Sequence, residues 1–484
     1  MEKVSICSED DMIKVIIIGG GAVGCAVARE ISRYECDVTL LEKCNDVSEG
    51  TSKANSGIVH AGHDATPGTN KARFNVLGNA MFDELSSQLD FPFKRNGAFV
   101  VCFDENDLPS LEKLLEKGEK NGVKGLKIID GDTARKIEPN LSQKVAYALY
   151  APSSGIVSPY EMVVAFAENA YDNGVKFELS CKVDGISKSG DGFVVSCGDK
   201  SFYGDVVVNC AGVYADEIND MVNEPTFKIT ARKGEYMLLD KYCGDIVSHT
   251  IFQLPTSMGK GVLVTQTTHG NILVGPTSVD IEDKDDVETT PEGLETLWNK
   301  GIESVPTLDR KQRITQFAGN RAHGDVEDFV VGWAQKGFFN VACIESPGLT
   351  SAPALGVYVA EEISSCYGLK ANEKFNPIRR DIPHLAVMTE EERNKLIAEN
   401  PDYGKIVCRC EVVSEGEIRA SICRPLGARS FDGVKRRTRA GMGRCQSGFC
   451  CPEIVKILSE ELGVSEEEIL KDDNVATMLI GRTK

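Results

Sequence analysis

Residues 12–24 read Met-Ile-Lys-Val-Ile-Ile-Ile-Gly-Gly-Gly-Ala-Val-Gly, an apolar run that passes directly into glycines. The run is rich in β-branched residues and predicts a buried parallel strand. The glycines have the spacing G-x-G-x-x-G, and residues 22–34 then predict a helix. A second strand is expected over residues 37–41, directly before Glu42. Together these features predict the first βαβ unit of a Rossmann-type α/β domain.

This pattern also predicts a dinucleotide site. Gly19 permits a tight turn, Gly21 lets the backbone approach a pyrophosphate, and Gly24 lets the helix pack on the strand. The start of the helix offers N–H groups and a positive dipole end to phosphates. Glu42 lies 23 residues after Gly19, where an acid accepts hydrogen bonds from a ribose 2′-OH and disfavours NADP. The pattern alone leaves FAD and NAD as alternatives.

Three later segments favour a flavin. Residues 50–57 form a small, polar loop bounded by glycines, which is suited to wrapping a second phosphate or a flavin. Residues 205–212 predict another apolar strand that ends in a small turn. Residues 345–356 open a helix with small side chains, and such a helix start is suited to an electron-rich flavin edge.

With these segments the chain resembles the FAD-dependent oxidoreductase family that contains D-amino-acid oxidase, glycerol-3-phosphate dehydrogenases and L-2-hydroxyglutarate oxidases. The resemblance covers about residues 12–375. It implies a Rossmann-type FAD domain split by an inserted, mostly antiparallel α+β substrate domain. The cofactor-binding residues that we predict are Gly19, Gly21, Ala22, Val23, Gly24, Glu42, Lys43, Thr51, Ser52, Ser56, Val183, Ala211, Gly212, Gly348, Leu349 and Thr350.

A second pattern lies near the C-terminus. Cys408 and Cys410 are spaced C-x-C, and after a gap of 34 residues Cys445 and Cys450 are spaced C-x4-C. Four thiolates in two close pairs can ligate zinc or a [2Fe–2S] cluster, and structural zinc more often uses C-x2-C pairs. The pattern is similar to the bacterioferritin-associated ferredoxin-like [2Fe–2S] module, a small helical domain, although Cys451 competes with Cys450 as the fourth ligand. A cluster beside a flavin would carry electrons singly to another protein, whereas zinc has no redox chemistry.

The expected domain organisation follows from both patterns. Residues 371–404 contain three prolines and one short helical pattern over residues 390–400, and we interpret them as a linker. The predicted ranges are 1–80, 151–225 and 326–370 for the FAD domain, 81–150 and 226–325 for the substrate domain, and 405–484 for the [2Fe–2S] domain.

Charge sets the C-terminal module apart. Residues 405–450 hold ten Lys and Arg against four Asp and Glu, so this segment is positive inside a chain of net charge −19. One interpretation is a solvated helix face around Lys435–Arg439. The other is that these cations stabilise the anionic cluster or bind an acidic partner.

Oxidation of an alcohol by a flavin needs a base for the hydroxyl proton and cations for an anionic substrate. His60 matches an (I/L)-H-x-G context that runs past the flavin in the resembled family, while a purely structural role is the alternative. His63 is a less certain candidate, one of His249, His269 and His323 could share the role, and His384 in the linker is expected to be irrelevant. For the anion we predict Arg321 and then Lys233, and a surface cation is the alternative for both.

The resemblance implies a small anionic substrate. Glycerol 3-phosphate, oxidised to dihydroxyacetone phosphate, is the prediction, with L-2-hydroxyglutarate or another 2-hydroxy acid as the alternative. Amine or opine oxidation and a non-catalytic electron-transfer subunit also stay open. The expected electron acceptor is a partner protein, either an NAD-linked flavoprotein or a quinone-linked subunit.

Composition excludes several other classes. A net charge of −19 argues against nucleic-acid binding. The sequence has no uninterrupted run of about 20 apolar residues, so we expect no direct membrane insertion. Residues 1–11 lack the basic start of a signal peptide. The 17 cysteines of such a long chain then predict reduced thiols in a cytoplasmic protein rather than a disulfide scaffold.

Overall fold

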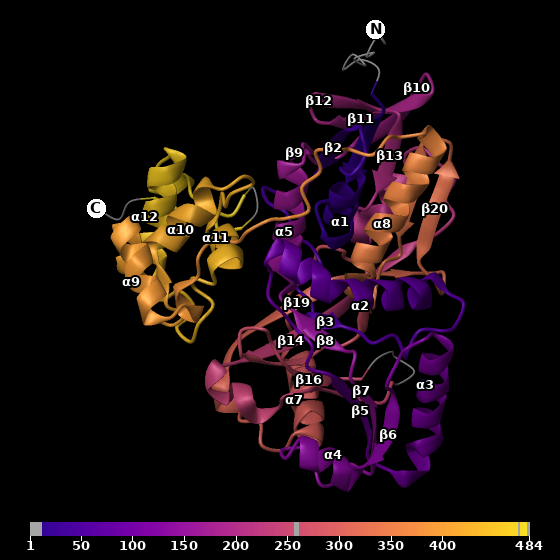
Figure 1. Cartoon of the computed structure of the whole chain (residues 1–484), viewed down its shortest axis with the longest axis vertical. Coiled ribbons are helices and arrows are strands. Elements are labelled where there is room, and N and C mark those ends of the chain that lie inside the picture. Colours follow the sequence, from indigo (N-terminus) through magenta and orange to yellow (C-terminus); the bar gives the residue numbers. More distant parts are fainter. Residues whose placement is uncertain (1–11, 256–260, 473–474, 482–484) are drawn as a thin grey trace.

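A six-stranded sheet forms the centre of the larger part of the molecule (Figure 1). The structure is a computed structural model that describes residues 12–255, 261–472 and 475–481. The strand order is β20-β21-β13-β1-β2-β9, and neighbours are parallel except β20 against β21. The strands are β1 (Lys14–Ile18), β2 (Asp37–Leu41), β9 (Lys176–Glu178), β13 (Val206–Asn209), β20 (Val330–Gln335) and β21 (Phe338–Ala342).

Each face of this sheet is covered by apolar packing. Helices α1 (Ala22–Ile31), α5 (Pro159–Asp172) and α8 (Gly348–Tyr367) pack on one face, against side chains such as Ile17 and Val208. The alternate residues, such as Ile16 and Val207, pack on the other face against the antiparallel strands β10 (Gly185–Ser189), β11 (Gly192–Cys197) and β12 (Lys200–Gly204). Burial on both faces explains why β1 is an unbroken apolar run.

A second, larger sheet of nine strands carries the inserted domain. Its order is β18-β14-β17-β16-β15-β5-β7-β6, with β19 paired to β14, and every pair except β5 with β15 is antiparallel. The strands are β5 (Ala98–Cys102), β6 (Lys127–Asp130), β7 (Tyr147–Ala151), β14 (Ile229–Leu239), β15 (Thr250–Gln253), β16 (Leu263–Gln266), β17 (Ile272–Gly275), β18 (Val279–Ile281) and β19 (Arg313–Gly324).

Helices and a small sheet complete this part of the chain. The helices α3 (Leu108–Lys120), α4 (Gly131–Ile137) and α7 (Pro291–Ser304) border the large sheet, and α6 (Ala215–Asp220) follows β13. The strands β3 (Ile58–Val59), β8 (Gly155–Val157) and β4 (Phe93–Lys94) pair beside α2 (Asn70–Leu89), between the two large sheets (Figure 1).

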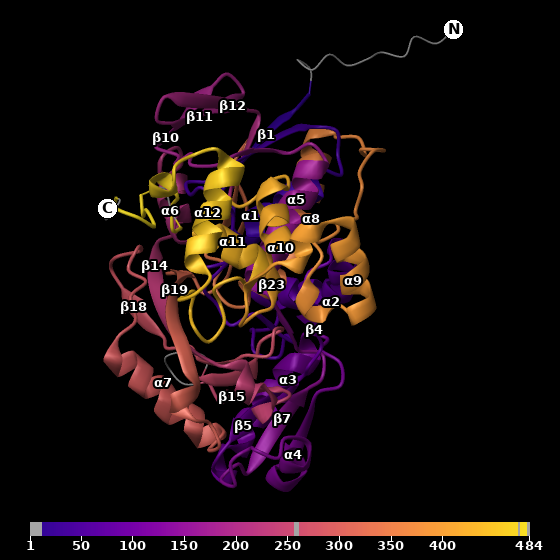
Figure 2. The same cartoon turned by 90° about the vertical axis from the view of Figure 1, so that its left-hand side faces the viewer.

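The C-terminal part is a separate small domain with its own core. Its elements are α9 (Glu390–Glu399), β22 (Ile406–Cys408), β23 (Val413–Ser414), α10 (Glu415–Cys423), α11 (Phe431–Thr438) and α12 (Cys451–Leu462). Figure 2 shows this domain in front of α5 and α1, on one side of the Rossmann-type domain. The architecture confirms the predicted fold class of a Rossmann-type α/β domain with an inserted, mostly antiparallel domain and a small helical C-terminal domain.

The structure corrects the interpretation of the basic segment at two of its residues. Arg436 and Arg437 are neither solvated nor left for another protein, because their side chains are 4% and 3% exposed and pair with carboxylates of the Rossmann-type domain. Arg439 pairs with Glu411 of its own domain and also donates to Tyr160 of α5. The acidic surface that these arginines bind belongs to the same chain.

Two expectations concern membranes and targeting. Among the described residues, no helix has both the length and the apolar character needed to cross a bilayer. The residues on which we based the expected lack of a signal peptide, 1–11, lie outside the described part of the chain.

Candidate active site and cluster site

The glycine loop lies at the carboxyl edge of the six-stranded sheet, between the ends of β1 and β13. Gly19 has φ +107°, and a Cβ at this position would lie 2.5 Å from the carbonyl oxygen of Cys210. A Cβ on Gly24 would lie 1.9 Å from the carbonyl oxygen of Gly19. The loop therefore excludes side chains where α1 meets the strand, which lets a phosphate approach its backbone closely.

The segment after β2 closes over this loop. Glu42 accepts a hydrogen bond from the Gly20 N–H (2.6 Å), and Ser52 Oγ accepts one from the Ala22 N–H (2.9 Å). Burial raises the pKa of the Glu42 carboxyl, although the backbone N–H groups of Cys44 and Gly20 oppose this. Thr51 donates to the carbonyl oxygen of Asn320 and so connects the segment to β19.

The other predicted cofactor residues are placed around the same edge. Ala211 and Gly212 follow β13 directly, and Val183 packs beside Leu41 in the core below the edge. Ser56 lies in the turn before β3, and Val23 lies in the first turn of α1. Lys43 Nζ lies 4.1 Å from the ring centroid of Tyr214, so its side chain reaches the turn that follows β13.

The start of α8 reaches the edge from the inserted domain's side. Gly348 and Leu349 form its first turn. The Thr350 side chain is fully buried and already serves β3, because its hydroxyl accepts from the His60 N–H (2.9 Å) and donates to the Ile58 carbonyl (3.2 Å). Any contribution of Thr350 to a cofactor must therefore come from its backbone.

These residues fit FAD. A glycine cradle without room for Cβ atoms meets a helix N-terminus, and a buried acid lies at the end of the next strand. Gly19, Gly21, Gly24, Glu42 and Ser52 would hold the dinucleotide. Bound FAD accepts a hydride from a substrate carbon.

His60 lies next to the start of α8, beyond β3. Its Nε2 is 3.4 Å from Ser346 Oγ, and its ring centroid is 5.8 Å from that of Phe252 on β15. The His60 carbonyl accepts from the side-chain amides of Asn75 and Asn79 (2.8 and 2.9 Å). The backbone of His60 is thus fixed from both sides, while its ring lies where β15 and the Ser346 turn meet.

Arg321 lies on the face of β19 that is turned toward the loop of residues 50–57. A Cβ on Gly319, two residues earlier on the same face, would lie 2.1 Å from the carbonyl oxygen of Ala54. Arg321 extends over Gly234 of β14, where a Cβ would lie 2.2 Å from its Nη2, and it donates to the Thr277 carbonyl (3.1 Å). Within the described residues, no carboxylate forms an ion pair with this guanidinium.

Lys233 requires a correction, because it does not share an anion site with Arg321. In the β14–β19 register Arg232 is opposite Arg321, and Lys233 is opposite Asn320. Since successive strand residues point to opposite faces, Lys233 and Arg321 project from opposite sides of the sheet. Lys233 is buried there, with its Nζ 2.7 Å from Asp286 Oδ2.

The other histidines fall into two groups. His323 shares a face with Arg321, and its Nδ1 lies 3.1 Å from Glu345, the residue before Ser346. His249 binds Glu138, and His269 binds Glu161 of α5 (2.6 and 2.7 Å), so both have other partners. The sequence analysis missed Glu345 and Ser346, although they lie in the small-residue segment that it identified before α8.

The four predicted cluster cysteines come together in the C-terminal domain. Cys410 Sγ and Cys445 Sγ are 3.6 Å apart, and Cys408 shares a hydrogen bond with Cys450. Among the described residues, no three His, Cys, Asp or Glu side chains are grouped to hold a single metal ion. The thiols approach two by two, a donor set that fits a two-iron cluster better than mononuclear zinc.

The pairs differ in burial and charge. Cys408 and Cys450 are 1% and 2% exposed, whereas Cys410 is exposed. The hydrogen bond from Cys450 and the backbone N–H groups of Gly441 and Glu411 lower the pKa of the Cys408 thiol to about 6, which favours the thiolate that iron binds. Cys451 begins α12 and packs against the core, so Cys450 is the one that meets Cys408.

Comparison with known proteins agrees with both sites. The model of the FAD-dependent oxidoreductase family matches residues 14–362, and that of the BFD-like [2Fe-2S] binding domain matches residues 406–460. The chain belongs to the FAD-dependent oxidoreductases. It is an enzyme of this class that binds FAD and carries a [2Fe–2S] domain at its C-terminal end.

Three individual proteins show which members of this family the chain is similar to. A glycerol 3-phosphate dehydrogenase of Caloramator mitchellensis is 48% identical over 98% of this chain and 99% of its own. The FAD-bound L-α-glycerophosphate oxidase of Mycoplasma pneumoniae superposes with a TM-score of 0.72 at 30% identity, over 77% of this chain and 99% of its own. The mitochondrial L-2-hydroxyglutarate dehydrogenase of Pongo abelii is 29% identical over 73% of this chain and 88% of its own.

Proposed function

We propose that the protein oxidises sn-glycerol 3-phosphate to dihydroxyacetone phosphate. The observation that carries the proposal is the position of Arg321 on the sheet face turned toward the loop of residues 50–57. Its guanidinium has no carboxylate partner among the described residues. Arginine binds phosphate through two parallel hydrogen bonds. The two glycerol-phosphate enzymes among the relatives support the same substrate.

In this proposal Arg321 and His60 have separate roles in the reaction. Arg321 holds the substrate phosphate, which orients the secondary alcohol toward the cofactor. His60 takes the hydroxyl proton at Nε2 as the carbon gives up a hydride, so the alcohol loses two electrons and two hydrogens and becomes a ketone. Ser346 Oγ lies 3.4 Å from Nε2 in the structure, and the substrate hydroxyl takes its place at Nε2 when the substrate binds.

L-2-hydroxyglutarate is the second candidate substrate. A carboxylate matches the guanidinium fork of Arg321 as well as a phosphate does, and the L-2-hydroxyglutarate dehydrogenase of Pongo abelii is a relative over most of the chain. The higher identity and fuller coverage of the glycerol 3-phosphate dehydrogenase favour the phosphate.

Flavin spectra test the substrate. Anaerobic addition of glycerol 3-phosphate is expected to bleach the flavin band, whereas L-2-hydroxyglutarate leaves it unchanged. Arg321→Gln should retain FAD and lose bleaching at substrate concentrations that suffice for the wild type. Arg232→Gln is the matched control, since Arg232 lies opposite Arg321 but is already paired with Asp280 (2.6 Å). Bleaching by the hydroxy acid alone would overturn the proposal.

The proposed exit for electrons is the cluster of Cys408, Cys410, Cys445 and Cys450. A [2Fe–2S] cluster carries one electron at a time to an acceptor protein. Three features support an exit at the Cys410 side: the exposure of Cys410, the 88% exposure of Phe449, and the exposed cations Arg409 and Arg444. An exposed aromatic side chain together with exposed cations fits an acidic redox protein.

Oxidation kinetics test this exit. Phe449→Ser should slow reoxidation of the substrate-reduced enzyme by an acidic ferredoxin, and reoxidation by ferricyanide should not change. Equal rates for the variant and the wild type with the ferredoxin would argue for another exit.

A further inference from the structure

The segment from Glu42 to Lys53 lies between the glycine loop and the C-terminal domain. On its inner side it is hydrogen-bonded to the glycine loop by Glu42, Ser48 and Ser52. The first and third of these bonds are described above, and the Ser48 N–H donates to the Gly20 carbonyl (2.9 Å). We call residues 42–53 the clasp.

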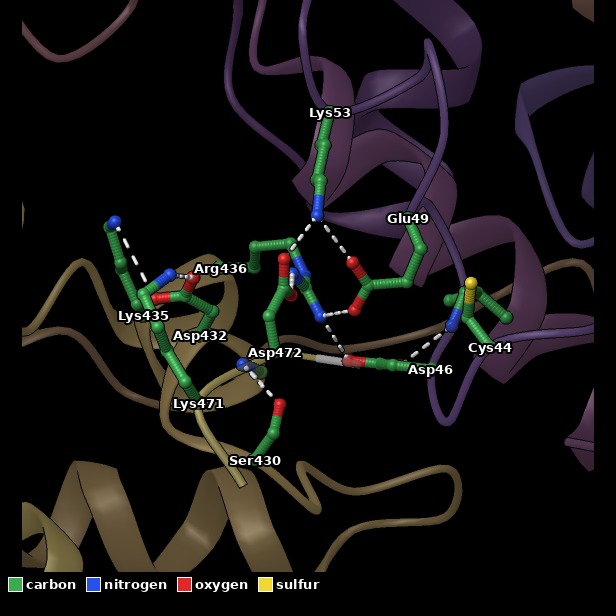
Figure 3. Close-up of polar contacts among 12 residues, drawn as sticks. Cys44, Asp46, Glu49, Lys53, Ser430, Asp432, Lys435, Arg436, Lys471 and Asp472 are labelled. Atoms are coloured by element: carbon green, nitrogen blue, oxygen red, sulfur yellow. Dashed lines mark hydrogen bonds and ion pairs between the residues drawn. The ribbon is translucent and has the colours of Figure 1, made fainter. Parts of the chain in front are cut away.

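The outer side of the clasp is held by the C-terminal domain (Figure 3). Arg437 binds both carboxylate oxygens of Asp46 in a fork, at 2.6 and 2.7 Å. Arg436 binds Asp46 (3.1 Å) and also Glu49. Lys53 also pairs with Asp472 of the C-terminal domain (2.6 Å). Along the clasp, the residues that bind the C-terminal domain therefore alternate with those that hold the glycine loop.

These side chains are buried, and of the two carboxyl groups Asp46 is the charged one, because burial raises the pKa of Glu49 to about 8. The side chains of Asp46 and Glu49 are both 3% exposed. Burial would raise the pKa of Asp46, but Arg437 and Arg436 lower it, so the carboxylate stays charged. Removal of one partner of a buried charge weakens the compensation of that charge, which favours movement of the backbone that carries it toward water. For Asp46 that backbone is the clasp.

A second ion pair joins the same two domains without touching the clasp. Arg424 of the C-terminal domain binds Glu168 of α5 at 2.7 and 3.0 Å. Simple attachment of the C-terminal domain would need only such pairs. The Arg436 and Arg437 contacts are different because they fall between the residues that close the glycine loop.

We propose that Arg436 and Arg437 are positioning residues for FAD. They hold the clasp against the glycine loop, so that Glu42 and Ser52 are in place when FAD binds, and the docked [2Fe–2S] domain thereby completes the FAD site. Coupling is reciprocal, so bound FAD also favours the docked position of the [2Fe–2S] domain.

The test is FAD affinity, which involves no substrate and is independent of the proposed reaction. FAD is removed reversibly from the full-length chain, and rebinding is followed by flavin fluorescence. Arg437→Gln is expected to raise the dissociation constant of FAD about 5- to 150-fold, the usual range for coupled sites. The control Arg424→Gln should change it less than twofold. The double variant Asp46→Asn/Arg437→Gln should recover part of the affinity, since no buried charge is left unpaired.

Two outcomes would overturn the proposal. One is an unchanged FAD affinity in Arg437→Gln with the iron–sulfur absorbance intact. The other is an equal loss in Arg424→Gln, which would indicate general detachment of the domain. If Arg437→Gln does not fold, the wild type provides the test: FAD should slow tryptic cleavage in the linker at Lys374 or Arg380. Equal cleavage rates with and without FAD would contradict the coupling.

Discussion

The two cofactor sites of this protein are built from different parts of the chain. The FAD site is mainly backbone, because its glycines leave no room for side chains at the edge of the sheet. The cluster site is four side-chain sulfur atoms on loops and element ends. A backbone site depends on the fold that carries it, whereas a thiolate site depends on the identity of single atoms.

The apolar cores that support the two sites also differ. The FAD site rests on two apolar cores, one on each face of the six-stranded sheet. The [2Fe–2S] site rests on the single apolar core that we find in the described part of the C-terminal domain. Domains of this size often depend on a metal for stability. We therefore expect loss of FAD to leave the large domain folded, and loss of the cluster to destabilise the small one.

The strongest challenge to the backbone site is an added methyl group. Gly24→Ala would place a Cβ 1.9 Å from the Gly19 carbonyl, a contact that only a shift of α1 can relieve. We expect complete loss of FAD binding, read as the absence of flavin absorbance in purified protein. Gly185→Ala on β10 is the control, because a Cβ there would meet only Ser196 Cβ, at 4.0 Å. Retention of flavin in Gly24→Ala would refute the backbone account of the site.

The corresponding challenge to the thiolate site replaces a single sulfur atom. Cys450→Ser should remove the iron–sulfur absorbance and lower the unfolding midpoint of the C-terminal domain, while the flavin remains. The neighbouring variant Cys451→Ser should keep both cofactors, since Cys450 and not Cys451 meets Cys408. If Cys451→Ser lost the cluster and Cys450→Ser kept it, Cys451 and not Cys450 would be the fourth ligand.

Local patterns predicted both sites, but not the contacts between the domains. The strand over residues 37–41 and the glycine spacing are local, and β2 has the expected bounds. The interpretation of Lys233 was wrong because its register against β19 is set by pairing over a long sequence distance. The basic run at Lys435–Arg439 was misread for the same reason, since Asp46 lies almost 400 residues away.

A smaller effect is expected where a side chain supports the backbone site. The Thr350 hydroxyl satisfies the buried His60 N–H and Ile58 carbonyl, so Thr350→Val leaves both without a partner. The expected loss of unfolding free energy is about 1–3 kcal/mol, measured by urea titration of the FAD-loaded protein. Thr350→Ser keeps the hydroxyl and should lose less. Equal losses in both variants would indicate that the γ-methyl group, and not the hydrogen bonds, matters.

The smallest predicted effect concerns His384, which ties the linker to the C-terminal domain. Its Nε2 lies 3.0 Å from Asp381 and its Nδ1 3.6 Å from Glu417. Burial alone would lower its pKa, but Asp381 and Glu417, with Glu161 nearby, raise it to about 10. The histidine we expected to be irrelevant is thus a charged link between two segments.

The sign of the resulting pH dependence follows from that raised pKa. A group whose pKa is higher in the folded state stabilises fully below its unfolded pKa of about 6.5, and this stabilisation is lost as pH rises through about 10. At pH 6 the wild type should exceed His384→Gln in stability by about 1–2 kcal/mol, since the histidine is partly exposed to solvent. The difference should shrink toward zero by about pH 10. Urea titrations of both proteins across this range measure it, and a constant difference would show that the imidazole acts by packing rather than by charge.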